Sequence, residues 1–176
     1  MKKLLIVLVF IIALSPVFAE RSIFAQDIGI RAGHGAFLNG DGGLHVLGGL
    51  TIGLSERLEF NPEVIVQVMP DPFKSLNLGF EIGYSLLGNR VNKTDIAGPI
   101  LNTVLCFGCF TDNLKPRYLT LRVVPLTLGT PFSGKRENFF PVGVAYDLQD
   151  KKFSCFFSIA IYDYYIKGTW AQLRGE

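Results

Sequence analysis

The chain has 176 residues, of which 49% are hydrophobic, 12% aromatic and 18% charged. This composition excludes an intrinsically disordered protein, because disordered chains are poor in apolar residues and rich in charge. Seventeen Lys and Arg residues stand against 15 Asp and Glu residues, a formal net charge of +2. The basic residues form no block, so the clustered positive charge of a nucleic-acid-binding surface is missing, and we expect no nucleic-acid partner.

The first residues have the pattern of a secretory signal peptide. Two lysines come before an uninterrupted apolar run, residues 4–14, and a Ser-Pro pair follows it. This run of 11 residues is too short for a transmembrane helix, which needs about 20 residues. We therefore predict a signal peptide at residues 1–19, with cleavage after Ala19 and Ala25 as the alternative site, and a single mature domain at residues 20–176.

Residues 75–86 alternate between apolar residues and polar or glycine residues without an error. Successive side chains of a β-strand point to opposite faces, so this segment carries an apolar stripe on one face and a polar stripe on the other. In the last such segment we expect Ile159 and Ile161 to continue the apolar stripe of Phe153, Cys155 and Phe157. Similar patterns, and one apolar run whose faces the pattern does not assign (100–110), predict eight strands: 24–33, 44–54, 57–68, 75–86, 100–110, 117–128, 138–148 and 152–165.

Short connections rich in turn residues join most of these predicted strands, which favours antiparallel pairing between consecutive strands. A meander of this kind hides both of its edges when it closes into an up-and-down barrel. Eight strands of about 9 to 11 residues fit the mature length. The predicted fold is therefore all-β, an eight-stranded antiparallel up-and-down β-barrel.

The composition of the polar stripe indicates which face lies inside. In water the apolar stripe of a barrel faces the interior, whereas in lipid it faces outward. Here the polar stripe combines glycine and serine with charges of both signs, which favours a membrane barrel with a packed polar lumen. Unpaired charges in a narrow interior are costly, so we expect the glutamates to pair with the arginines and to stabilise the barrel. The predicted lumen charge network consists of Arg31, Arg57, Glu59, Glu63, Glu81, Arg122 and Asp147.

On strand count, alternation and signal peptide, residues 24 to about 166 resemble the small eight-stranded outer-membrane barrels, a group that includes the OmpA-type transmembrane domain and the OmpW-like and OmpX-like proteins. The resemblance implies the outer membrane of a Gram-negative-type envelope, with outer-membrane lipid and the barrel-assembly machinery as partners. It also implies a role in structure, surface interaction or passage of small hydrophobic molecules.

Two features depart from that group. The chain continues past Trp170 instead of ending on an aromatic last strand, and the longer connections, 88–99 and 129–137, fall at the end of the barrel that carries the termini. Either a strand is miscounted or the barrel is atypical. The sequence does not specify an oligomeric state.

Two sets of residues invite a chemical interpretation. Cys106 and Cys109 form a C-x-x-C motif, but three steps along a strand place their side chains on opposite faces, too far apart for an unstrained disulfide. We expect structural thiols here and an apolar filler at Cys155, with a bulged local disulfide and a redox or metal site as alternatives. His34 and His45 are not grouped with further ligands, so we expect neither a metal nor a cofactor.

The protein is predicted to be non-enzymatic, with no catalytic residues. Two other functions stay open. A soluble exported β-barrel would carry an apolar ligand with its apolar stripe turned inward, and a barrel enzyme would modify membrane lipids. The barrel enzyme would need His34, Asp71 and Ser75 to meet at one rim of the barrel as a catalytic set. Residues of these types are common in loops in any case.

Overall fold

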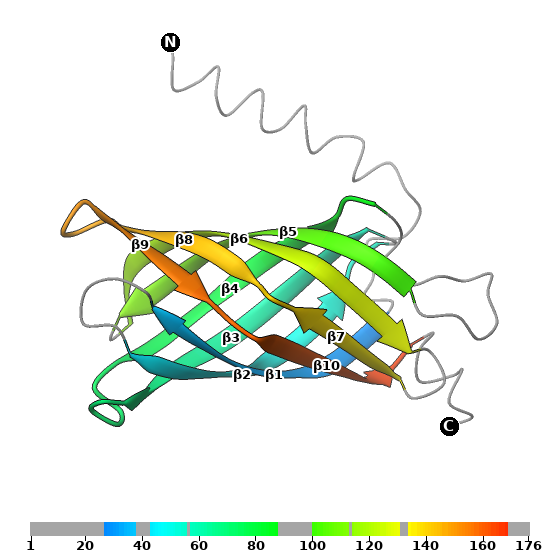
Figure 1. Cartoon of the computed structure of the whole chain (residues 1–176), viewed down its shortest axis with the longest axis horizontal. Helices are drawn as coiled ribbons and strands as arrows, with labels where there is room; N and C mark the ends of the chain where they lie inside the picture. The colour runs from blue at the N-terminus through cyan, green and yellow to red at the C-terminus, as the bar shows by residue number, and fades with distance from the viewer. Residues whose placement is uncertain are drawn as a thin grey trace, which may run out of the picture.

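The computed structural model describes residues 27–37, 43–55, 57–87, 100–112, 114–130 and 134–168. The predicted signal peptide and the segment from Trp170 onward lie outside these residues. Within the described part the chain is all-β, with ten strands in one antiparallel sheet (Figure 1). None of the described residues belongs to a helix long and apolar enough to cross a membrane.

The hydrogen-bonded strands of the sheet close on themselves. Strands β1 to β6 pair in chain order. Two pairs of short strands connect β6 back to β1: β7 and β10 do so in one half of the ring, and β8 and β9 do so in the other half. Each circuit contains eight strands, because β1 to β6 belong to both. The bounds are β1 Asp27–Phe37, β2 Leu44–Gly53, β3 Leu58–Met69, β4 Leu76–Ser85, β5 Ile100–Asp112, β6 Lys115–Thr130, β7 Lys135–Phe139, β8 Val142–Asp147, β9 Lys152–Phe157 and β10 Ala160–Lys167.

The two strands predicted last are each divided in the structure, and the two breaks lie side by side. Between β7 and β8, Phe140 has a φ of 54°, outside the extended region, and Pro141 has no amide hydrogen to donate. Between β9 and β10 lie Ser158 and Ile159. Backbone hydrogen bonds join the breaks, from the Phe140 amide to the Ile159 carbonyl (2.9 Å) and from the Ser158 amide to the Pro141 carbonyl (2.8 Å). The chain therefore makes eight passes, although the structure contains ten strands.

The break between β9 and β10 also contains one extra residue. Gly33 of β1 pairs with Ile161, whereas Ala36 pairs with Phe157, so two residues of β1 lie opposite three residues of the other chain segment. Such a bulge shifts the alternation by one position. The prediction that Ile161 belongs to the outer apolar stripe is therefore wrong: its side chain is 1% exposed, and Asp163 and Tyr165 are buried with it.

The interior of the ring holds the buried charged and polar side chains together with a few apolar ones, and its outer surface is apolar. In β4, Glu81 and Ser85 are each 1% exposed, whereas Leu76, Phe80 and Ile82 are 39–44% exposed. The same pattern is repeated around the ring by outward-facing Ile30, Val46, Leu50, Val64, Leu105, Phe107, Leu121, Val142, Val144, Tyr162 and Tyr164. This distribution is the reverse of the one found in a water-soluble sheet, which buries its apolar face.

Antiparallel alternation places the connections at two opposite ends of the ring (Figure 1). β4 ends and β5 begins at the end of the ring where β1 begins and β10 finishes, so the connection predicted at residues 88–99 belongs to that end, as the sequence pattern predicts. The connection predicted at residues 129–137 is shorter, because β6 extends to Thr130 and β7 already begins at Lys135. The opposite end carries the turn that joins β8 to β9, and we call it the turn end.

Two adjacent glycines of β2 provide a test of how closely the strands approach. A Cβ atom at Gly49 would overlap the carbonyl oxygen of Pro62 and lie 3.0 Å from the Cα of Glu63, whereas at Gly48 it would meet nothing within 4 Å. We expect Gly49→Ala to lower the free energy of unfolding by about 1 to 3 kcal/mol. Gly48→Ala should be neutral or slightly stabilising, because alanine restricts the unfolded chain. Denaturant unfolding followed by circular dichroism measures both, and equal losses would contradict the close approach at Gly49.

Candidate functional site

The middle of the ring interior holds seven buried charged side chains, which we call the central cluster. Each of these residues is at most 3% exposed. Removing charges from water costs several kcal/mol per ion unless each charge is paired and hydrogen-bonded, so the pairing decides whether this interior is stable. The members are Arg31, Glu59, Glu63, Glu81, Arg122, Arg136 and Asp163.

Two arginines and two carboxylates form one half of the cluster. Asp163 accepts hydrogen bonds from Arg31 Nε (2.6 Å) and from Arg136 Nη2 (2.7 Å). Glu59 bonds the same two guanidinium groups, with Arg136 Nη1 at 2.6 Å and Arg31 Nη2 at 3.3 Å. The amide of Asn138 adds a hydrogen bond of 2.8 Å to Asp163. Each arginine thus bridges both carboxylates, which ties β1, β3, β7 and β10 together.

The other half of the cluster extends this network to β4 and β6. Glu63 Oε1 accepts hydrogen bonds from Arg31 Nη1 (2.8 Å) and from Arg122 Nη2 (3.2 Å). Arg122 also forms an ion pair with Glu81. Four carboxylates face three guanidinium groups in the whole cluster, so one negative charge is in excess when all of them are ionised.

The structure brings together five of the seven residues predicted for the charge network, namely Arg31, Glu59, Glu63, Glu81 and Arg122. The prediction is wrong for Arg57, which is exposed because β3 begins only at Leu58, and the alternation does not reach the residue before it. Asp147 is buried, but it pairs with Arg117 at the rim instead of with the central cluster.

Arg117 holds three acidic residues together at the turn end of the ring. Its guanidinium group contacts Asp112 at 2.5 Å, Asp147 at 2.9 Å and Asp150 at 3.4 Å. Asp147 also accepts hydrogen bonds from the amides of Gln149 (2.8 Å) and Asp150 (3.0 Å), which shape the turn between β8 and β9. The Arg117 side chain is 24% exposed, so solvent screens these pairs and their role is to fix the turns.

Arg136 and Asp163 belong to the central cluster but were missing from the predicted network. Arg136 falls inside the connection predicted at residues 129–137, which is strand in the structure. Asp163 follows the bulge, where the alternation has changed phase. The sequence contains one signal for it, since Asp163 stands between Tyr162 and Tyr164, the arrangement of an inward charge between outward aromatic residues.

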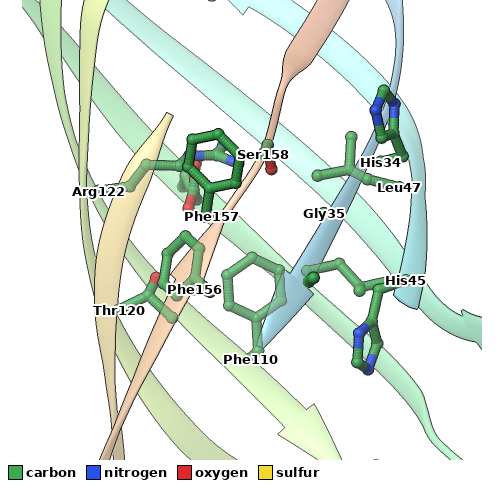
Figure 2. Close-up of a pocket in the computed structure, with 13 residues that line it drawn as sticks. His34, Gly35, His45, Leu47, Phe110, Thr120, Arg122, Phe156, Phe157 and Ser158 are labelled. Atoms are coloured by element: carbon green, nitrogen blue, oxygen red, sulfur yellow. The ribbon is translucent and has the colours of Figure 1, made fainter. Parts of the chain in front are cut away.

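A cavity lies in the interior between the central cluster and the turn end (Figure 2). Its empty volume is about 480 Å³, including its opening to solvent. Glu81 and Arg122 of the central cluster form part of its lining, together with Phe110, Phe156 and Ser158. The cavity is therefore mostly apolar on its walls and charged on the side of the central cluster.

The predicted alternatives for catalysis can be placed in the structure. His34 lines the cavity, but Asp71 is exposed and pairs with Lys74 at 3.4 Å. The hydroxyl of Ser75 donates to Gln67 Oε1 at 3.4 Å. Among the described residues no contact joins the three members of the hypothetical triad, so that alternative is not supported.

The cysteines form no disulfide, so the alternative of a local bridge within the C-x-x-C motif is wrong. Cys106 is buried in the interior and Cys109 lies on the other face of β5, as the strand geometry requires. Within the part of the chain that the structure describes, no three His, Cys, Asp or Glu residues are grouped so as to hold a metal ion. Comparison of the chain with protein-family models, with curated proteins and with solved structures finds no match.

Proposed function

We propose that the protein is an eight-stranded up-and-down β-barrel of an outer membrane, exported by its signal peptide, with a structural or surface-interacting role and no catalytic activity. The observation that carries this proposal is the reversed burial of the ring, with charges inside and large apolar side chains outside. Monomeric soluble proteins rarely expose contiguous apolar patches larger than a few hundred Å². In a lipid bilayer the same outer surface is stabilising.

The positions of the lysines support a bilayer as the surrounding medium. Every lysine in the described ranges lies in a turn or at the first or last residue of a strand: Lys74, Lys115, Lys135, Lys151, Lys152 and Lys167. The middle of the outer surface is left to apolar residues. A cation is costly at the centre of a bilayer but is tolerated near its interfaces, so this distribution fits a membrane-spanning barrel.

The packed interior favours a structural role over an open pore. The central cluster joins strands from opposite sides of the ring, and the interior of an eight-stranded barrel is narrow enough for side chains to fill it. A soluble carrier of apolar ligands would need the apolar stripe inside, whereas Phe80 and Ile82 are 39% and 41% exposed. We therefore favour the membrane barrel over that alternative.

Fractionation of the cell envelope tests the proposal. We expect the protein, expressed from its full sequence, in the outer-membrane fraction, extractable only with detergent, and running as two bands on SDS gels. The folded form should migrate differently before boiling, because a closed barrel resists SDS, and boiling should convert it to the unfolded band. A chain found in the soluble fraction with a single unshifted band would contradict the proposal.

A further inference from the structure

The cavity beside the central cluster is kept open by glycines opposite two of its aromatic residues. Gly79 pairs with Phe110 across β4 and β5, and Gly143 pairs with Phe156 across β8 and β9. A Cβ atom at either glycine would overlap the ring of its partner. The rings therefore rest against bare backbone, on one side of the space that Figure 2 shows, with Leu47 on the other. Glycine in a strand often marks such a close approach.

The cavity lining contains two hydroxyl groups with unused hydrogen-bonding capacity. Ser158 is 7% exposed, and among the described residues no hydrogen-bond partner is present for its hydroxyl. A Cβ atom at Gly35 would lie 2.6 Å from Ser158 Oγ, so the glycine leaves this hydroxyl uncovered. Thr120, on another wall of the cavity, has a buried hydroxyl that also has no partner. A hydroxyl group is both a donor and an acceptor, so either side chain can bond an oxygen atom of a molecule bound in the cavity.

The charges next to the cavity select against an anionic ligand. The Nη2 atom of Arg122 is already bonded to Glu63 and Glu81, although the buried Nε atom of Arg122 has no partner among the described residues. The central cluster carries one carboxylate more than it has guanidinium groups. A ligand carboxylate would add a second excess negative charge to a poorly solvated space. We propose that the cavity binds a small uncharged molecule with an apolar body, an aromatic ring or a short alkyl chain, and one carbonyl or hydroxyl oxygen that bonds to Ser158.

Three probes of similar size separate the features of this site: acetophenone has a ring and a carbonyl, ethylbenzene lacks the carbonyl, and benzoate is charged. The isotopically labelled full chain is titrated in nanodiscs, or in buffer if the chain is soluble, and the amide resonances of Ser158 and Gly35 are followed. We expect saturable shifts with acetophenone, about three- to tenfold weaker binding of ethylbenzene because one hydrogen bond is lost, and no saturable shift with benzoate.

Three variants assign the effect to the site. Ser158→Ala should bind acetophenone and ethylbenzene equally, without loss of stability, because it removes a hydroxyl that bonds to no described residue. Ser85→Ala is the matched control, since Ser85 is also buried but does not line the cavity, and it should keep the preference. Leu47→Phe should fill the cavity and abolish binding of both probes while the circular dichroism spectrum is retained.

The proposal is overturned if wild-type protein shows no saturable shift with acetophenone, if Ser158→Ala keeps the preference, or if benzoate binds most tightly. Because the site is defined by the ring interior, this result is independent of the membrane proposal. A soluble chain that binds acetophenone would overturn the outer-membrane assignment alone. A membrane-inserted chain that binds none of the probes would overturn the binding site alone.

Discussion

Arg31→Met is expected to lower the free energy of unfolding by about 3 to 5 kcal/mol, because removing one member of a buried ion-pair network leaves its partners with uncompensated charge. Arg31 bonds Asp163, Glu63 and Glu59, and it is 3% exposed. When all carboxylates of the central cluster are ionised, the cluster without Arg31 holds two excess negative charges instead of one. Urea unfolding in detergent micelles, followed by far-ultraviolet circular dichroism, measures the loss.

Arg57→Met is the matched control for this experiment. Arg57 is exposed and lies just before β3, so the same substitution there should change the free energy of unfolding by less than about 0.5 kcal/mol. If both variants lose the same amount, the cost comes from removing a positive charge anywhere in the protein. The central cluster would then not be the source of the stability that we assign to it.

Ile82→Arg is expected to lower the stability of the protein in lipid vesicles by about 2 to 4 kcal/mol, the cost of a cation near the middle of a bilayer. Ile82 is 41% exposed on the outer face of β4, paired with Phe60 and Phe107 on the neighbouring strands. Unfolding in urea from preformed vesicles, with band migration on unboiled SDS gels as the readout of the folded fraction, measures the change.

Phe73→Arg controls for the general effect of a new cation. Phe73 is 81% exposed in the turn between β3 and β4, next to Lys74, and we place it outside the hydrocarbon layer. The Phe73→Arg substitution should change the free energy of unfolding by no more than about 1 kcal/mol. An Ile82→Arg variant that is as stable as the wild type would show that the outer face of β4 does not contact lipid, and the membrane proposal would fail.

The sequence predicts the faces of uninterrupted strands well, because period two needs no knowledge of the neighbouring strand. In β4, the alternation from Leu76 to Ser85 correctly separates outward apolar residues from inward polar ones. The same reasoning places Glu59 and Glu63 of β3 inside. The inward charges of β1, β3, β4 and β6 were therefore predictable from local patterns alone.

Arg136 and Asp163, the two members of the central cluster that were not predicted, depend on the pairing of distant strands, which a local sequence pattern does not show. The bulge between β9 and β10 is defined by its register against β1, and only that register shows why both Ala160 and Ile161 are buried. The partners of each arginine depend on ring closure, since Arg31 and Asp163 are separated by 132 residues. The cavity likewise depends on pairing, because Gly143 leaves room for Phe156 only when β8 and β9 lie side by side.

The position of the charges along the chain determines when the protein can become stable during assembly. Glu59 on β3 receives its two cations from segments that are far apart in the sequence, Arg31 on β1 and Arg136 on β7. Asp163, which both arginines share, is on the final strand. A sheet that has formed only from β1 to β6 lacks Arg136 and Asp163, so its network of ion pairs is incomplete. We therefore expect ring closure to be a late, cooperative event that requires contacts of high sequence separation.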